Sequence, residues 1–271
     1  MTIRVRAPAT TANLGSAFDC AAVALDLWNE LEVGEGDDEP EANHLGVRAF
    51  ARLAPADGRT FVFSDRIPRE RGLGSSAAVI ALGLVAGALA SGRERGPEEL
   101  LAEGLPLEGH GDNLAAALAG GVCLTWGGRI ARLADSVPAV PLALVPDATV
   151  STADARAGLP ARVPHADAAF TAGRAAVLGA ALASGSEELF AAALDDRLHE
   201  PYRATTAPLL AAVRARRPAG ALGATLSGSG PTVIVWAREG DAEGCAEELE
   251  ARYPEAQVLR LAVATTGAGV A

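Results

Sequence analysis

The stretch RGLGSSAA, residues 71–78, places glycines and serines directly before an apolar run. The run from Ala77 to Ala90 consists of Ala, Val, Leu, Ile and Gly, and its length predicts a buried helix rather than a strand. The glycines therefore precede the N-terminus of that helix. Unpaired N–H groups and the positive end of the helix dipole gather there, and glycine lets a ligand approach the backbone closely. A phosphate group suits this position.

The same stretch also fits an ordinary capped helix. In that interpretation Ser75 or Ser76 is the N-cap and the glycines only form the preceding turn. If the stretch binds a phosphate-bearing ligand, Gly74→Val is expected to abolish that binding while the chain stays folded, because a branched side chain intrudes where the ligand approaches. The cluster alone does not separate the two interpretations.

The composition of the chain excludes several classes of binding partner and cofactor. The 271 residues carry a net charge of −11 with a pI near 4.9, which argues against nucleic acid and against an anionic membrane surface. The chain contains no lysine, so a P-loop lysine and a lysine Schiff base to pyridoxal phosphate are excluded. Cys20, Cys123 and Cys245 lack the spacing of a disulfide framework or a zinc site. The start, MTIRVRAPAT, does not resemble a signal peptide, and we expect a soluble protein of the reduced cytoplasm.

Strand-like and helix-like segments mix irregularly along the chain, which indicates the α+β class. The first strand is expected to end at Pro8, and residues 34–40 form a charged turn. Helices are predicted at 77–90, 97–105, 166–183, 186–198 and 241–253. Prolines interrupt the pattern at 134–141, which predicts an N-terminal domain of residues 1–137 and a C-terminal domain of residues 138–271.

Four loops of small and polar residues interrupt the apolar chain, in the order PATTANLGSAFD, PRERGLGSSAA, EGHGDN and LSGSGPT. Together they resemble the GHMP superfamily of small-molecule kinases. The segments PATTANLGSAFD, EGHGDNLAAALAGG, STADARAGLP and DRLHEPYR resemble the homoserine kinase family within it, and the resemblance runs from Val5 to about Trp236. It implies a two-domain GHMP fold, with the nucleotide-phosphate loop in the N-terminal domain and a ferredoxin-like C-terminal domain.

The resemblance also implies a reaction in threonine biosynthesis: with Mg²⁺ present, ATP phosphorylates the hydroxyl of L-homoserine to give O-phospho-L-homoserine. It assigns to the nucleotide the residues Arg71, Gly72, Leu73, Gly74, Ser75, Ser76 and Ala77. It assigns Mg²⁺ to Ser76 and Glu108, with Glu103 as the alternative carboxylate.

For the acceptor, the resemblance assigns homoserine to Asn13, Asp19, Asn113, Arg156 and Arg203. These residue types suit an amino acid zwitterion, whose ammonium requires a carboxylate and whose carboxylate requires guanidinium groups. An acidic protein has to gather such positive charge locally.

No strong general base faces a hydroxyl in the four loops, and phosphoryl transfer can proceed by positioning and charge stabilisation. Asn113 is interpreted as orienting the hydroxyl, in a catalytic set with Ser76 and Glu108, while Asp112 remains the alternative base. Each assignment has an ordinary structural alternative: Asp19 caps a helix that begins at Cys20, and His110 and Asn113 cap a helix at 114–119. His44, His165 and His199 are interpreted as structural or surface residues.

The chain also departs from the family pattern. Ser16 and Ala17 stand where the family usually has Pro-Gly, Gly111 stands where it has Pro, and the chain is shorter between Leu31 and Phe63. These departures leave open the shape of the acceptor pocket and the adenine contacts. Two other functions therefore stay open, a GHMP-type kinase of another small hydroxylated metabolite and a non-catalytic nucleotide-binding protein. The oligomeric state stays open too, with a homodimer as one option.

Overall fold

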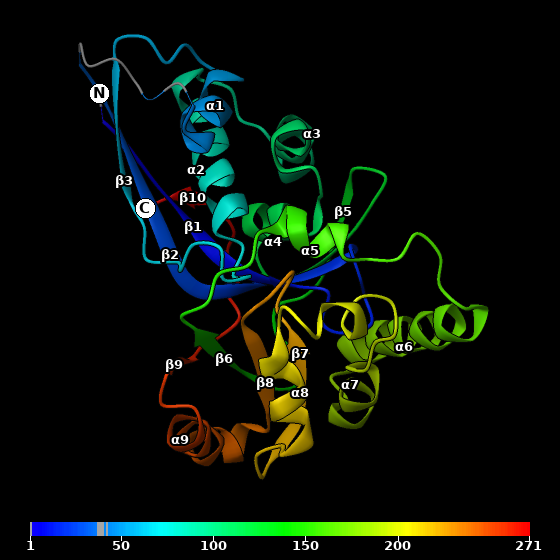
Figure 1. The fold of residues 1–271 in the computed structure, drawn as a ribbon. Coiled ribbons are helices and arrows are strands. Elements are labelled where there is room, and N and C mark those ends of the chain that lie inside the picture. Colours follow the sequence, from blue (N-terminus) through cyan, green and yellow to red (C-terminus); the bar gives the residue numbers. More distant parts are fainter. Residues whose placement is uncertain (1, 37–40, 42) are drawn as a thin grey trace.

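The computed structural model describes residues 2–36, 41 and 43–271. Part of the charged turn predicted at 34–40 lies outside them, at residues 37–40. The described chain forms two antiparallel sheets, each with helices packed on it, which make the upper and lower halves of Figure 1. Mixed helix and antiparallel sheet is the predicted α+β class.

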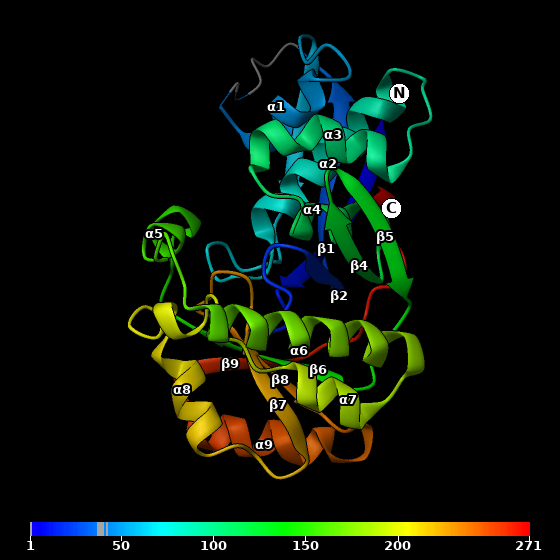
Figure 2. The same cartoon turned by 90° about the vertical axis from the view of Figure 1, so that its right-hand side faces the viewer.

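The first sheet has the strand order β10-β1-β2-β4-β5, and β3 pairs with the second half of the long β2. Its strands are β1 (Ile3–Ala12), β2 (Ala21–Glu35), β3 (Arg59–Ser64), β4 (Val122–Trp126), β5 (Arg129–Ala134) and β10 (Gly269–Val270). The helices α1 (Leu45–Ala51), α2 (Ser75–Ala90), α3 (Pro97–Glu108) and α4 (Asp112–Ala119) gather beside this sheet (Figures 1 and 2).

Two predictions about the start of the chain are wrong. The strand β1 does not end at Pro8 but continues to Ala12, because a bulge between Pro8 and Ala9 accommodates a residue that has no N–H to donate. No helix follows Asp19 either, since β2 begins at Ala21. Asp19 is therefore not a helix cap.

The second sheet has the strand order β7-β8-β6-β9, with β6 (Val140–Pro146), β7 (Ala221–Leu226), β8 (Val233–Ala237) and β9 (Ala256–Arg260). Its first strand lies between its third and fourth, which is the ferredoxin-like order that the resemblance implies. Its helices are α5 (Thr152–Ala157), α6 (His165–Ser184), α7 (Glu187–Ala193), α8 (Pro208–Ala215) and α9 (Ala242–Arg252), with 3-10 turns at Pro201–Arg203 and Glu239–Asp241.

Alternation along β8 shows how the two halves join. Val233 and Val235 face the core that α8 and α9 cover, whereas Ile234 and Trp236 belong to the large core that includes the first sheet. The second sheet is thus apolar on both faces. One continuous core runs through both halves.

The helix predicted at 186–198 is shorter than expected. Helix α7 ends at Ala193, and the carboxylate of Asp196 then accepts hydrogen bonds from the backbone N–H groups of His199 (2.7 Å) and Glu200 (3.0 Å). This turn ends the helical pattern before residue 198, because a short carboxylate satisfies N–H groups in a non-helical conformation.

The predicted domain boundary at residue 137 lies between β5 and β6, where the chain passes from the first sheet to the second. The end of the chain returns, because β10 pairs with β1 and Val263 bridges to Leu25. The division into two domains stays a prediction. In the part of the chain that the structure describes, no helix combines the length and apolarity needed to cross a bilayer.

Helix α2 allows a test of this packing through its glycines. A Cβ added at Gly83 would lie 2.1 Å from the carbonyl oxygen of Gly46 in α1, whereas at Gly173 in α6 it would meet no described atom within 4 Å. We expect Gly83→Ala to lower the free energy of unfolding by about 1–3 kcal/mol through overpacking. Gly173→Ala is the matched control and is expected to raise it by about 0.5–1 kcal/mol, because alanine favours the helix. Urea denaturation of both variants measures the effect, and a neutral Gly83→Ala would contradict this packing.

Candidate active site

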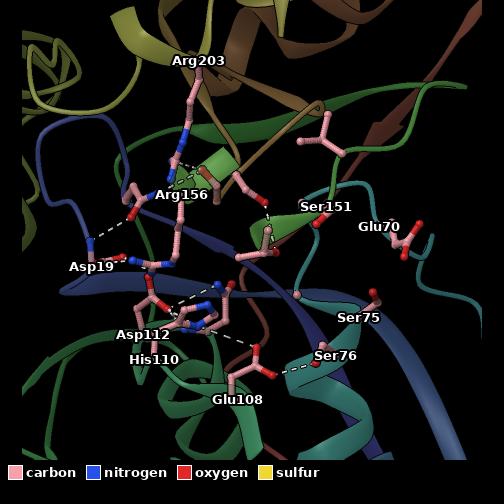
Figure 3. A pocket seen from close by; sticks show the side chains of 18 of the residues that line it. Asp19, Glu70, Ser75, Ser76, Glu108, His110, Asp112, Ser151, Arg156 and Arg203 are labelled. Carbon is pink, nitrogen blue, oxygen red and sulfur yellow. Dashed lines mark hydrogen bonds and ion pairs between the residues drawn. The ribbon is translucent and has the colours of Figure 1, made fainter. Parts of the chain in front are cut away.

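A cavity of about 330 Å³ lies at the junction of the two halves (Figure 3). The loops before α2 and after α3, the β1–β2 connection, α5 and the β7–β8 turn line it. Segments far apart in the sequence thus meet at one place. Most of the predicted site residues lie in this lining, namely Asn13, Asp19, Gly72, Gly74, Ser75, Ser76, Glu108, Asn113, Arg156 and Arg203.

Three residues predicted to bind the nucleotide lie outside the lining. Leu73 and Ala77 are fully buried, so their side chains belong to the core. Arg71 lies 3.9 Å from Asp147 on the adjacent surface. A nucleotide contact from the first two would have to come from the backbone.

The N-terminus of α2 opens into this cavity without a side-chain cap. Its N-cap is Gly74, in a left-handed conformation with φ of 67°, and Ser75 and Ser76 are already the first helical residues. The interpretation of either serine as an N-cap is therefore wrong. The first N–H groups of α2 lack an intrahelical partner and lie beside the cavity, where an anion suits them.

Packing and backbone conformation within the protein require glycine at positions 72 and 74, whether or not a ligand binds. A Cβ at Gly74 would lie 1.9 Å from Oγ1 of Thr10, and one at Gly72 would lie 2.3 Å from the carbonyl oxygen of Ser227. Both residues also have positive φ. The expectation that Gly74→Val spares the fold is therefore wrong, because the valine would displace a buried strand residue before it met any nucleotide.

Ser76 and Glu108 face each other across the cavity floor. The Ser76 hydroxyl donates to Oε2 of Glu108 at 2.7 Å, as Figure 3 shows. Burial raises the pKa of Glu108, while Ser76 and His110 act in the opposite direction. The alternative carboxylate, Glu103, instead pairs with Arg52 and Arg95 away from the cavity. Geometry favours Glu108 over Glu103 as the carboxylate beside the phosphate loop.

These residues suit a magnesium ion that arrives with a nucleotide. Only 7% of the Glu108 side chain is exposed, and its nearest basic neighbour among the described residues is His110, whose Nδ1 lies 3.9 Å from Oε1, so a divalent cation would suit this carboxylate. Mg²⁺ prefers oxygen ligands and completes its shell with water and phosphate, so one carboxylate and one hydroxyl suffice from the protein. No group of three or more His, Cys, Asp or Glu side chains that could hold a metal ion occurs among the described residues.

Asn113 lies between the phosphate loop and the rest of the cavity. Its Oδ1 accepts from Oγ1 of Thr10 at 2.7 Å, and its backbone N–H donates to Asp112. The amide nitrogen of Asn113 contacts Oδ1 of Asp112 at 3.4 Å, and the second N–H of this group remains able to donate to a hydroxyl oxygen. Asp112 is itself buried, and burial raises the pKa of its carboxyl group.

Asp19 and Arg156 form a bidentate ion pair, with N–O distances of 2.6 and 2.8 Å. Asn13 holds Asp19 in place, because its Oδ1 accepts from the backbone N–H of Asp19 at 3.0 Å. Asn13 and Asp19 both have positive φ, so the β1–β2 connection is a tight, defined turn. The predicted ammonium and carboxylate ligands thus neutralise each other.

Arg203 is held differently. It is 3% exposed, and its Nη1 donates to the Gly228 carbonyl and contacts Nδ1 of His199, both at 3.0 Å. Its Nε is buried and has no hydrogen-bond partner among the described residues. Burial and, secondarily, the charge of Arg156 lower the pKa of Arg203. A buried guanidinium with an unsatisfied donor indicates an anionic ligand.

Sequence reasoning did not assign to this site Thr10, His110 and His199, which contact its members, nor several further lining residues, namely Leu45, Glu70, Val150, Ser151, Thr152, Gly228 and Ser229. Thr10 lies within PATTANLGSAFD, but the first strand was expected to end at Pro8, so the contact of Thr10 with Asn113 was not foreseen. His110 lies 3.9 Å from Glu108 and 4.0 Å from Asp112 and does not cap α4, whose N-cap is Gly111 without a side-chain bond. His199, within DRLHEPYR, contacts Arg203. The signal for Thr10, His110 and His199 was their place inside the quoted motifs.

Comparison with known proteins agrees with this geometry. The family model for the GHMP kinases N terminal domain matches residues 42–121, and the model for GHMP kinases C terminal matches residues 178–255. These two matches, together with the fold and the open N-terminus of α2, identify the chain as a small-molecule kinase of the GHMP type, which uses ATP.

Comparison with individual relatives identifies the family within the GHMP kinases. The chain is 39% identical over 278 residues to the homoserine kinase of Gloeobacter violaceus, covering 93% of each chain. It is 41% identical over 261 residues to that of Streptomyces coelicolor, covering 87% of this chain and 84% of the relative. The crystal structure of homoserine kinase from Cytophaga hutchinsonii has a TM-score of 0.89 at 25% identity, covering 100% of this chain and 97% of that one. The chain belongs to the homoserine kinase family.

The histidine beside Arg203 gives a pH prediction. Burial lowers the pKa of His199 from 6.5 to about 4, although Asp196 opposes the shift. We expect nitrogen NMR to show a neutral ring, protonated at Nε2, from pH 7 down to about pH 5.5. Because the unfolded chain takes up this proton at higher pH than the folded chain, His199 lowers the free energy of unfolding as pH falls from about 6.5 to 4. An imidazolium signature at pH 6 would contradict the buried placement.

Proposed function

We propose that the chain transfers the γ-phosphoryl group of ATP to the hydroxyl of L-homoserine, forming O-phospho-L-homoserine in threonine biosynthesis. The observation that carries the choice of acceptor is the buried Arg203, whose Nε lacks a partner among the described residues in a cavity that also contains a carboxylate, Asp19. A zwitterionic amino acid supplies a carboxylate for Arg203 and an ammonium that can replace Arg156 at Asp19. Family membership supports the same acceptor.

In this proposal the amino acid inserts at the Asp19–Arg156 pair. Asp19 binds the ammonium, and Arg156 and Arg203 bind the carboxylate. The exchange leaves each charged side chain with a partner of opposite charge: the ion pair between Asp19 and Arg156 is replaced by one pair between Asp19 and the ammonium and one between Arg156 and the carboxylate. Asn13 and the backbone of the β1–β2 turn keep Asp19 in position throughout.

Catalysis in this proposal depends on positioning rather than on a strong base. The N–H groups at the start of α2 and the Ser76 hydroxyl bind phosphate oxygens, and Asn113 donates to the acceptor hydroxyl to aim its oxygen. Glu108 and Ser76 would hold Mg²⁺, which would supply charge neutralisation to the phosphates of the nucleotide. Asp112 remains the alternative that takes up the hydroxyl proton, since its raised pKa suits a proton acceptor.

We infer the cytoplasm as the compartment, in keeping with three free cysteines among the described residues. A homodimer remains one option for the assembly.

The proposed reaction is tested by measuring ADP release with ATP, Mg²⁺ and a panel of hydroxylated metabolites. L-Homoserine is expected to give the highest kcat/KM, because it fits both charge sites and places its hydroxyl toward Asn113. Chelation of Mg²⁺ is expected to abolish turnover. A higher kcat/KM for L-threonine, L-serine or a simple alcohol would assign another acceptor, and ATP binding without turnover on any acceptor would make the chain a non-catalytic nucleotide binder.

Arg203→Ala tests the carboxylate site. A charge-assisted hydrogen bond to a buried carboxylate contributes about 1.5–3 kcal/mol, so KM for L-homoserine should rise roughly 10- to 150-fold while KM for ATP stays within about twofold. Arg162→Ala is the matched control, because Arg162 is exposed and outside the cavity lining. A larger effect on ATP than on homoserine would make Arg203 a phosphate ligand.

A further inference from the structure

A buried histidine outside the cavity lining contacts the guanidinium that binds the acceptor in the proposal above. His199 is fully buried, and both of its ring nitrogens have partners. Nε2 lies 3.0 Å from the carbonyl oxygen of Gly15, and Nδ1 lies 3.0 Å from Nη1 of Arg203.

These partners determine the tautomer. A carbonyl oxygen can only accept a hydrogen bond, and a guanidinium can only donate one. The ring of His199 therefore carries its proton on Nε2 and offers the lone pair of Nδ1 to Arg203. The neutral ring is what burial favours at this position.

The contact determines which edge of the guanidinium is available. Nη1 has two N–H groups, and they face His199 and the carbonyl of Gly228. The edge formed by Nε and Nη2 is then left without a partner among the described residues, in a side chain that lines the cavity. This edge has the two parallel donors that a carboxylate accepts in a bidentate geometry.

The imidazole ring itself is fixed from several sides. Phe18 stacks on it with ring centroids 4.9 Å apart, and the backbone N–H of His199 donates to Asp196 at 2.7 Å. The Gly15 carbonyl is also constrained, because Gly15 has φ of 75° and an added Cβ there would lie 2.1 Å from the Leu194 carbonyl oxygen. A fixed ring presents its lone pair in one direction.

We propose that His199 is a positioning residue for acceptor binding, because its Nδ1 sets the rotation of the Arg203 guanidinium so that the Nε–Nη2 edge faces the acceptor carboxylate. This inference rests on the proposed function, which supplies the carboxylate. His199 does not touch the substrate and acts through Arg203.

Two amide variants separate the two ring contacts. His199→Asn keeps an acceptor near the place of Nδ1, whereas His199→Gln keeps a donor near the place of Nε2 and loses the contact to Arg203. We expect His199→Gln to raise KM for L-homoserine roughly 5- to 30-fold, with kcat and KM for ATP unchanged. His199→Asn is expected to stay within about threefold of the wild type. Thermal unfolding of both variants reports on the fold separately.

A double-mutant cycle with Arg203→Ala completes the experiment. If His199 acts through Arg203, then His199→Gln has no further effect on KM for L-homoserine when Arg203 is already alanine. The proposal is overturned if the glutamine effect persists in that background, if Asn and Gln are equally damaging, or if KM for ATP rises in parallel. Absence of wild-type turnover on L-homoserine would overturn the proposed function instead.

A measurement on the wild-type protein keeps the proposal testable if the variants do not fold. In ¹⁵N NMR, a guanidinium held at Nη1 is expected to give separate Nη1 and Nη2 signals for Arg203 without any ligand. A single averaged signal, produced by free rotation about the Nε–Cζ bond, would overturn the positioning role whatever the acceptor is.

Discussion

The open N-terminus of α2 is the constraint on which the rest of the site depends. A helix end without a side-chain cap stays rigid only if its loop is held by other segments. Here the Leu73 carbonyl accepts from the backbone of Thr10 at 3.1 Å, and the Gly72 carbonyl accepts from the Ser227 hydroxyl at 2.6 Å. The first contact comes from β1 and the second from the β7–β8 turn, so both halves of the chain fix the loop. The Gly228 carbonyl, in the same β7–β8 turn, accepts from Asn13 and from Arg203, so the residues proposed to bind phosphate and those proposed to bind the acceptor lie at one junction.

The arginines near this junction differ in whether a carboxylate neutralises them. The chain has no lysine and a net charge of −11, so its positive charge near the cavity is arginine at fixed positions. Arg156 is compensated by Asp19, and the buried Glu200 is compensated by Arg214 at 2.6 Å. Arg203 instead has the neutral His199 and a carbonyl as partners. Because no carboxylate among the described residues pairs directly with it, the Arg203 guanidinium is able to bind an external anion.

Long and strongly patterned segments could be predicted from the sequence, and context-dependent features could not. The helices predicted at 77–90, 166–183 and 241–253 follow their local patterns and correspond to α2, α6 and α9. The continuation of β1 past Pro8 depends on a bulge against β2. The end of α7 is followed by a turn in which the Asp196 carboxylate accepts backbone hydrogen bonds. The periodic pattern of apolar residues along the chain predicts neither feature. Within the site, the motifs indicated which residues converge. The contact between His199 and Gly15 joins residues 184 positions apart, and sequence spacing carries no information about such a pair.

The contrast between the two arginines bears on how the pocket would select its acceptor. An alcohol without a carboxylate would leave the Nε of Arg203 buried and unpaired, which costs about 1–3 kcal/mol relative to an acceptor that satisfies it. A hydroxy acid without an ammonium would have to separate Arg156 from Asp19 and leave that carboxylate without a cation. A zwitterion avoids both penalties, because each of its charges replaces or completes a contact. In the proposed function, selection of an amino acid over a simple alcohol would follow from these two penalties, and the separation between the charged residues and Asn113 would select the length of the acceptor.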